Sequence, residues 1–142
     1  MRVAVVDGRG GGIGKAIVAK MKKEFPSGVR IIALGTNALA TSAMLKAGAD
    51  QGATGENAIV QTVQRVDLVT GCLGIVLAHS MLGELTPAMA EAVAKCDAPK
   101  LLIPMNQCGV DVVGVRQESL PAMIDILVAA IKDMLPAGDR SP

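Results

Sequence analysis

The fold is decided by residues 2–14, which read RVAVVDGRGGGIG. Apolar residues run almost without interruption up to Asp7, and this run predicts a buried strand. Glycines follow at once, and beyond Ile13 apolar residues recur at helical spacing as far as Met21. A strand that passes through glycines into a helix is typical of the first unit of an α/β sheet, and its loop is suited to holding a phosphate.

Strand-like and helix-like segments alternate along the rest of the chain. Further strands are predicted at Val29–Leu34, Asp67–Thr70, Lys100–Pro104 and Val110–Val115, the last two as a hairpin at a sheet edge. Four helices are predicted from their N-terminal caps, which are Thr36 or Asn37, Thr54, Thr86 followed by Pro87, and Ser119. A further short helix is predicted over Ile75–Met81, and a loop over Gly48–Gly55. We therefore expect an α/β, Rossmann-like three-layer domain with a mainly parallel sheet of about five strands. One domain is expected over residues 1–135, followed by a loose tail over residues 136–142.

The spacing of the glycines narrows the class of phosphate loop. A Walker A loop requires a glycine where Arg9 stands and a hydroxyl where Ala16 stands, so a magnesium-dependent NTPase is disfavoured. The pattern GxGxxG starts at Gly8 and Gly10 but has Ile13 in place of its third glycine. The pattern GxxxGxG is matched in full by Gly8, Gly12 and Gly14. The candidate phosphate-binding residues are Gly8, Arg9, Gly10, Gly11, Gly12, Ile13 and Gly14.

The segment GRGGGIGKAIV, residues 8–18, resembles the TGxxxGIG loop of short-chain dehydrogenases. Three departures limit what this resemblance implies. Asp7 stands where those enzymes carry Thr, no carboxylate follows the second strand at Leu34–Asn37, and a chain without Tyr has no Tyr-x-x-x-Lys pair. The resemblance therefore implies nucleotide binding without that family's chemistry. A glycine turn that binds nothing is the alternative.

Other candidate residues follow the predicted strands, because parallel strands bring their carboxyl ends to one edge of a sheet. Thr36 and Asn37 are placed to meet an adenosine ribose or the 2′-phosphate of NADP, and Thr70 and Gly71 lie at the carboxyl end of the third predicted strand. Asp7 is expected to accept N–H groups of the loop, with a metal or ribose ligand as the alternative. Weak catalytic candidates are Cys108, Asn106 and His79, although a buried, hydrogen-bonded role is the commoner one for such a histidine.

Composition excludes several classes of function. The net charge is +1, and the chain has one Phe and no Trp or Tyr, so we expect no nucleic-acid partner and no anionic membrane surface. Three cysteines without a CxxC pair indicate reduced thiols and a cytoplasmic protein, and no metal site is assigned. The predicted helix from Asn37 to Ala47 has Lys46 as its lone charge, which favours a homo-oligomer, unless its Asn, Thr and Ser residues make it polar enough for solvent.

Taken together, longer segments resemble a family of short bacterial proteins of unknown function. They include DGRGGGIGKAI, IIALGTNALATSAMLKAGA, GATGENAIV, SMLGELTPAMAEA and NQCGVDVVGV, and the resemblance runs from Met1 to about Leu135. It implies no activity or site residue. The leading hypothesis is a nucleotide-binding protein that takes NAD or NADP; whether it is also a small oxidoreductase is left open. The alternatives are a non-catalytic sensing or interaction module for NAD(P), CoA, AMP or S-adenosylmethionine, and, as a minor one, a metal-dependent enzyme.

Overall fold

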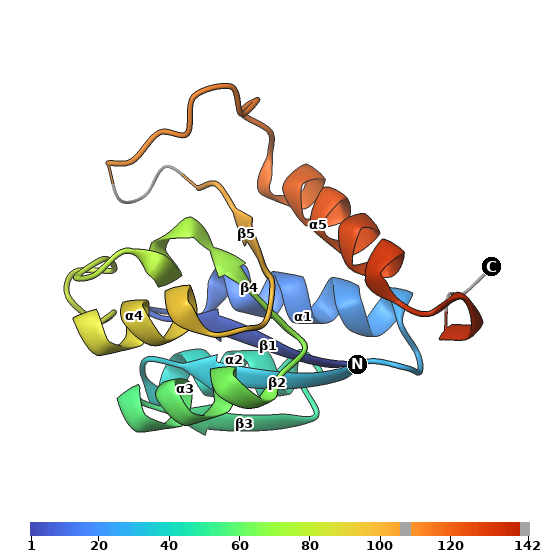
Figure 1. The fold of residues 1–142 in the computed structure, drawn as a ribbon, viewed down its shortest axis with the longest axis horizontal. Helices are drawn as coiled ribbons and strands as arrows, with labels where there is room; N and C mark the ends of the chain where they lie inside the picture. Colours follow the sequence, from blue (N-terminus) through green and yellow to red (C-terminus); the bar gives the residue numbers. More distant parts are fainter. Residues whose placement is uncertain (106–108, 140–142) are drawn as a thin grey trace.

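A five-stranded parallel sheet forms the centre of the computed structural model, which describes residues 1–105 and 109–139 (Figure 1). The strand order is β3-β2-β1-β4-β5, and every neighbouring pair is parallel. The strands are β1 (Arg2–Asp7), β2 (Arg30–Gly35), β3 (Gln51–Thr54), β4 (Leu68–Cys72) and β5 (Lys100–Ile103). The predicted α/β class and mainly parallel five-stranded sheet are therefore confirmed.

Helices cover both faces of this sheet and make the three layers. The described helices are α1 (Gly12–Glu24), α2 (Ala38–Lys46), α3 (Glu56–Thr62), α4 (Pro87–Lys95) and α5 (Leu120–Met134), with 3₁₀ turns η1 (Val63–Arg65), η2 (Leu73–Val76) and η3 (Ala137–Asp139). Val3 and Val5 of β1 pack with α1, α2 and α5, whereas Ala4 and Val6 pack with α3 and α4. Each face of the sheet thus has its own apolar core, and β1 contributes to both.

The order of the strands creates a switch point between β1 and β4. From β1 the chain moves outward to β2 and then β3, and it returns to the other side of β1 for β4 and β5. The connections after β1 and after β4 therefore leave the shared carboxyl end of the sheet in opposite directions. Such a point is where ligands bind in open parallel sheets.

One predicted loop contains a strand. The structure pairs Gln51–Thr54, as β3, with β2, although Gly48–Gly55 has no apolar alternation to mark a strand. The pairing depends on backbone hydrogen bonds at the sheet edge, and tertiary context overrides propensity there. Thr54 consequently belongs to β3 and its hydroxyl pairs with that of Thr41, so the predicted Thr54 cap is wrong: Gly55 is the N-cap of α3.

The predicted strand Val110–Val115, and with it the hairpin, is also wrong. This segment has no regular structure, Gly109 and Gly114 have φ of 68° and 88°, and Val113 is 98% exposed. Left-handed backbone at both glycines interrupts an extended conformation, and the segment crosses from β5 to α5 as an irregular connection (Figure 1).

Two smaller differences concern the short helix predicted at Ile75–Met81 and the tail predicted over residues 136–142. The helix predicted at Ile75–Met81 is a 3₁₀ turn, η2, which ends at Val76. Beyond it the backbone has positive φ at His79, Met81 and Leu82, which a helix cannot accommodate. In the predicted tail, residues 137–139 form η3, and residues 140–142 lie outside the described residues. Within the described part of the chain, no helix has both the length and the apolarity that crossing a membrane requires.

Candidate functional site

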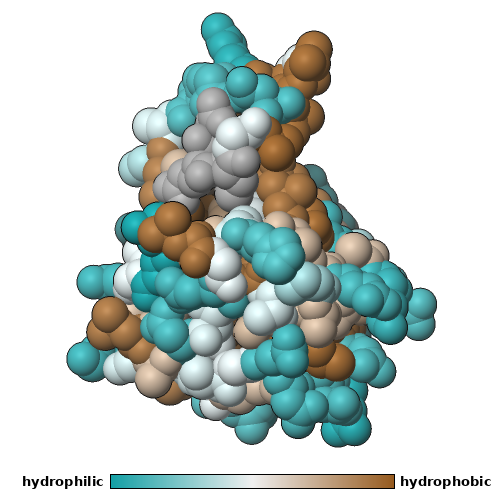
Figure 2. Space-filling model, turned by 90° about the vertical axis from the view of Figure 1, so that its left-hand side faces the viewer, coloured by the Kyte–Doolittle hydropathy of each residue, from teal (hydrophilic) through white to brown (hydrophobic). Residues whose placement is uncertain are grey.

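A cavity of about 500 Å³ lies at the switch point. Its lining combines the loop after β1 with the end of β4 and one residue of the loop that leads to α4: Asp7, Gly8, Arg9, Gly10, Gly11, Gly12, Ile13, Cys72 and Met81. The predicted phosphate loop therefore lines a cavity at the position where the topology places a ligand. Figure 2 views the molecule from the side of the strands' carboxyl ends.

Asp7 holds this loop in shape. Its side chain is buried and accepts hydrogen bonds from the backbone N–H of Gly8 (2.8 Å) and of Gly14 (2.6 Å), one on each carboxylate oxygen. This is the structural role expected from the sequence. Burial raises the pKa of the Asp7 carboxyl, and the two N–H donors oppose that effect. Both oxygens are therefore engaged by the protein's own backbone.

Three glycines of the loop are required by the protein's own packing. A Cβ at Gly14 would lie 2.6 Å from Met44 Sδ and 2.8 Å from Asp7 Cβ, and a Cβ at Gly8 would lie 2.6 Å from Thr36 Oγ1. Gly11 has a φ of 74° and would meet the backbone of α2. These glycines are explained by close approach or by left-handed backbone, without any ligand.

Gly10 and Gly12 differ from the other glycines of the loop. Neither has a positive φ, and a Cβ at either would meet nothing within 4 Å. Both are exposed and line the cavity, and Gly12 is the first residue of α1. Among the described residues, no hydrogen bond is found to the N–H of Gly12 or Ile13, which stand at the positive end of α1. The absence of side chains at Gly10 and Gly12 thus leaves open space beside the N–H groups of Gly12 and Ile13.

Glu84 is a site residue that the sequence did not reveal. It lies in the loop between η2 and α4, yet its Oε1 accepts hydrogen bonds from Arg9 N (3.0 Å), Thr36 Oγ1 (2.8 Å) and Asn37 Nδ2 (2.6 Å). These donors hold the pKa of the Glu84 carboxyl below its usual range, with the N–H of Arg9 contributing most. No motif or spacing in the sequence links residue 84 to residues 36 and 37, because only the fold brings them together.

Thr36 and Asn37 stand at the end of β2, as predicted. Asn37 also caps α2, since its Oδ1 accepts the N–H of Ala40 (2.9 Å), and its Nδ2 donates to the carbonyl of Arg9 (2.9 Å). The loops after β1, β2 and η2 are thereby joined by one set of hydrogen bonds. The predicted binding role of these two residues stays a prediction.

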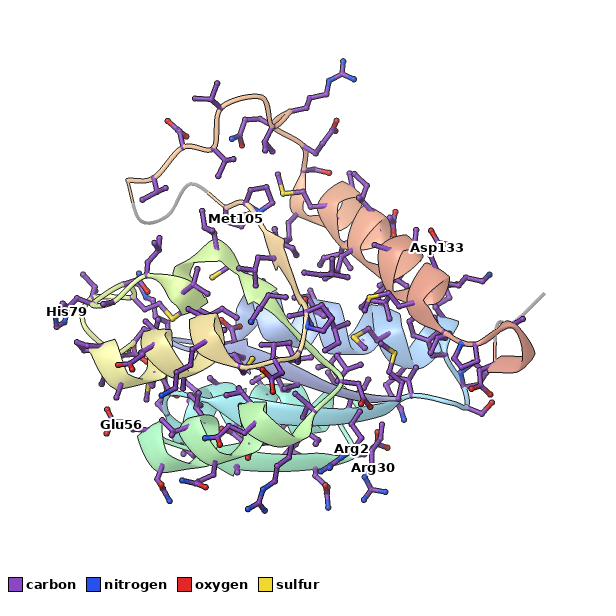
Figure 3. The ribbon with its side chains drawn as sticks, in the orientation of Figure 1. Arg2, Arg30, Glu56, His79, Met105 and Asp133 are labelled. Carbon is purple, nitrogen blue, oxygen red and sulfur yellow. The ribbon has the colours of Figure 1, made fainter. Side chains whose placement is uncertain are left out.

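The other predicted site residues are placed elsewhere. Thr70 is fully buried in β4, and Gly71 packs against the carbonyl of Val6; neither lines the cavity. His79 is exposed, so the expectation of a buried histidine is wrong, and it lies on the outer edge of its loop (Figure 3). Asn106 and Cys108 lie outside the described residues. Within residues 1–105 and 109–139, no group of three His, Cys, Asp or Glu side chains could hold a metal.

The sheet order and the glycine loop at its switch point define a Rossmann-like α/β domain with a candidate anion site. The chain belongs to the family described as domain of unknown function DUF3842, whose model matches residues 2–136. This confirms the resemblance to a family of unknown function, whereas the resemblance of the loop to that of short-chain dehydrogenases stays a prediction. No curated protein matches the chain.

Among solved structures, the chain is similar to a dodecameric FMN-dependent UbiX-like decarboxylase from Escherichia coli O157:H7. The identity is 15%, the match covers 94% of each chain, and the TM-score is 0.49. At this level of similarity, no residue role or ligand is transferred from that enzyme to this chain.

Proposed function

We propose that this protein binds a nucleotide and holds its phosphate at the start of α1. The observation that carries the proposal is the contrast within the glycine loop. Gly8, Gly11 and Gly14 are needed for packing, whereas Gly10 and Gly12 are not, and they leave the cavity open beside the N–H groups of α1. Absent side chains at such positions let a phosphate approach the backbone, and the helix dipole favours its charge.

NAD or NADP is the nucleotide that we favour. With a phosphate at the loop, the end of β2 is where a doubly wound sheet receives the adenosine ribose, and Thr36 and Asn37 stand there. CoA and AMP are alternatives that bring a phosphate to the same loop, and S-adenosylmethionine, which has no phosphate, is the alternative in which the glycines admit another part of the ligand. FMN is disfavoured, because Phe25, the single aromatic residue, is buried and leaves no ring to stack on a flavin.

A non-catalytic nucleotide sensor is the second candidate, and the lining of the cavity favours it over an oxidoreductase. Among the described lining residues, the charged side chains are those of Asp7 and Arg9. Asp7 is bonded to the loop, and His79 lines a different cavity from the glycines. General acid–base chemistry requires a proton-transferring group that is free to act on the ligand; both oxygens of Asp7 already accept backbone N–H groups, and His79 does not line this cavity.

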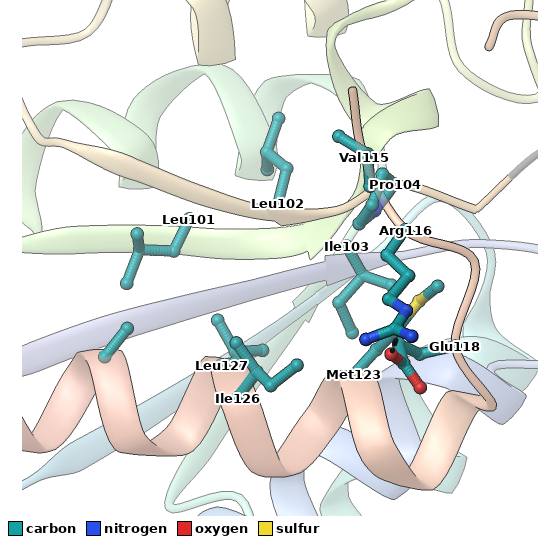
Figure 4. Close-up of a pocket in the computed structure, with 11 residues that line it drawn as sticks. Leu101, Leu102, Ile103, Pro104, Val115, Arg116, Glu118, Met123, Ile126 and Leu127 are labelled. Atoms are coloured by element: carbon teal, nitrogen blue, oxygen red, sulfur yellow. Dashed lines mark ion pairs between the residues drawn. The ribbon is translucent and has the colours of Figure 1, made fainter. Parts of the chain in front are cut away.

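We also propose that the protein forms a homo-oligomer through the face made by β5 and α5. A cavity of about 430 Å³ opens there, lined mainly by apolar side chains such as Leu101, Ile103 and Ile126 (Figure 4). Ile126 is 63% exposed, and the nearby segment carries the exposed Val112 and Val113. Figure 2 shows apolar surface over this upper part of the molecule. A second copy fits best, since a net charge of +1 gives little self-repulsion.

A thermal-shift panel tests the proposed nucleotide binding. The ligands are NAD, NADP, AMP, ATP, CoA, S-adenosylmethionine and FMN, and the proteins are the wild type, Gly12→Asp and Gly138→Asp. A ligand at a hundred times its Kd adds about 2.7 kcal/mol, or a rise in Tm of about 5–11 °C. Gly12→Asp should fold, since its Cβ meets open space and an acid suits the first turn of a helix, but its carboxylate should repel the phosphate.

Gly138→Asp is the matched control, because its Cβ also meets nothing within 4 Å and the residue lies in η3, outside the cavity. The proposal requires that one ligand shift the wild type and Gly138→Asp but not Gly12→Asp. If no ligand stabilises the wild type, or if Gly12→Asp responds like the wild type, the loop is a turn without a binding function.

A further inference from the structure

The Glu84 carboxylate is bound on one side and open on the other. Its Oε1 accepts three hydrogen bonds, whereas no hydrogen bond to its Oε2 is found among the described residues. Glu84 is half-buried, so its side chain is not fully enclosed by the protein. Three donors on one oxygen fix the orientation of the group and leave Oε2 with its full capacity to accept.

The carboxylate stands between the end of β2 and the rim of the cavity. It bonds Thr36 and Asn37, which follow β2, and its Oε1 would lie 3.4 Å from a Cβ on Gly8, which lines the cavity. Arg9, whose N–H it accepts, also lines the cavity. When a phosphate is at the start of α1, a ribose carried by that phosphate extends toward the end of β2.

We propose that Glu84 selects nucleotides whose adenosine ribose has a free 2′-hydroxyl, an inference that rests on the proposed function. A fixed carboxylate accepts a hydrogen bond from a ribose hydroxyl, and it repels a phosphate ester at the same position. In many dinucleotide-binding folds, an acidic residue at the end of the second strand has this role. Here that strand ends in Gly35-Thr36-Asn37, and the carboxylate comes from a loop that lies after β4.

The competing explanation is that Glu84 ties the loops together and contacts no ligand. The two explanations differ in their effect on ligand choice. A purely structural carboxylate alters the stability of the loops and weakens all nucleotides alike. A residue that reads the ribose changes the ratio of affinities between nucleotides that differ only at the 2′ position.

Calorimetric titrations with AMP, 2′-deoxy-AMP and adenosine 2′,5′-bisphosphate, and with NAD against NADP, test this inference. The wild type should bind AMP on the order of 10- to 100-fold more tightly than either analogue, and NAD more tightly than NADP, as expected for one hydrogen bond to a charged group. Glu84→Gln should reduce these ratios to below about threefold. Glu91→Gln, which removes an exposed carboxylate on α4, should leave them unchanged.

A second variant separates hydrogen bonding from charge and does not depend on the folding of Glu84→Gln. Glu84→Asp retracts the carboxylate and should lose the preference for AMP over 2′-deoxy-AMP while still excluding the 2′-phosphate. If the wild type binds these nucleotides without discrimination, or if Glu84→Gln retains the wild-type ratios, the inference is wrong and the proposed function stands. Binding of FMN or CoA alone overturns it in the same way, whereas absence of any nucleotide binding refutes the proposed function itself.

Discussion

Replacing Gly14 with alanine should destabilise the protein, whereas the same change at Gly12 should not. At Gly14 the new Cβ would lie 2.6 Å from Met44 Sδ, 2.8 Å from Asp7 Cβ and 2.9 Å from Asp7 Oδ2. The methionine can move its flexible end, but Asp7 is fixed in the central strand by its two hydrogen bonds to the loop. The clash therefore falls on the group that holds the loop in shape.

The expected size follows from two opposing effects. Forcing an extra carbon into a packed site costs about 1–3 kcal/mol, and a weakened hydrogen bond to a charged group adds up to about 1.5–3 kcal/mol. Against this, alanine in a helix is favoured over glycine by about 0.5–1 kcal/mol. Gly14→Ala should thus lose about 1–4 kcal/mol of unfolding free energy. Gly12→Ala, whose Cβ meets nothing within 4 Å, should be unchanged or gain up to about 1 kcal/mol.

Urea unfolding of the two variants and the wild type, followed by far-UV circular dichroism, measures both free energies under identical conditions. The slope with denaturant should be the same for all three proteins, so the midpoints report stability directly. If Gly14→Ala proves as stable as Gly12→Ala, the close approach of Asp7 to α1 does not constrain this position, and the division of the glycines into structural and ligand-facing ones is incorrect.

Three further predictions follow from other contacts. Asp7→Asn tests the raised pKa of the Asp7 carboxyl. Because this pKa is higher in the folded protein than its ordinary value of 3.8, the stability that the carboxyl contributes is full below pH 3.8 and is lost as the pH rises through the folded pKa. In urea titrations, the unfolding free energy of the wild type relative to that of Asp7→Asn should therefore fall from pH 4 upward. Asn37→Ala should cost about 1–3 kcal/mol, and Asn37→Ser, which keeps an acceptor for the cap, should recover about 1 kcal/mol; equal losses would exclude the cap. Ile126→Glu should shift the oligomer to monomer in light scattering, whereas Leu39→Glu, on α2, should not; the reverse result would place the interface on α2.

The parts of the fold that the sequence predicts are those where local signals and tertiary structure agree. The apolar run to Asp7, the glycines and the helical periodicity define β1, its loop and α1, and all three are confirmed. Asn37, Thr86 and Ser119 cap their helices as their residue types suggest. The position of the glycine loop at the carboxyl end of the sheet then follows from the parallel topology.

Other features depend on contacts that no local pattern encodes. Gln51–Thr54 is a strand because β2 offers an edge, and Val110–Val115 is not one although its composition favours strands. Glu84 reaches the end of β2 through positive-φ backbone at Met81 and Leu82, a path that periodicity cannot reveal. The sequence shows no carboxylate after the second strand, and in the fold Glu84, from a distant loop, stands at that position.

The central place of β1 has a consequence for how the chain folds. β1 pairs with β2 on one side and with β4 on the other, where the N–H of Arg2 also donates to Asp67, 65 positions further along the chain. β1, β2 and β3 are consecutive in the sequence and lie side by side in the order β3-β2-β1, so they can assemble early as a half-sheet in which the β1 edge is still unpaired. Closing that edge must wait for β4, which makes long-range pairing the slow step and leaves the β1 edge open to aggregation during synthesis.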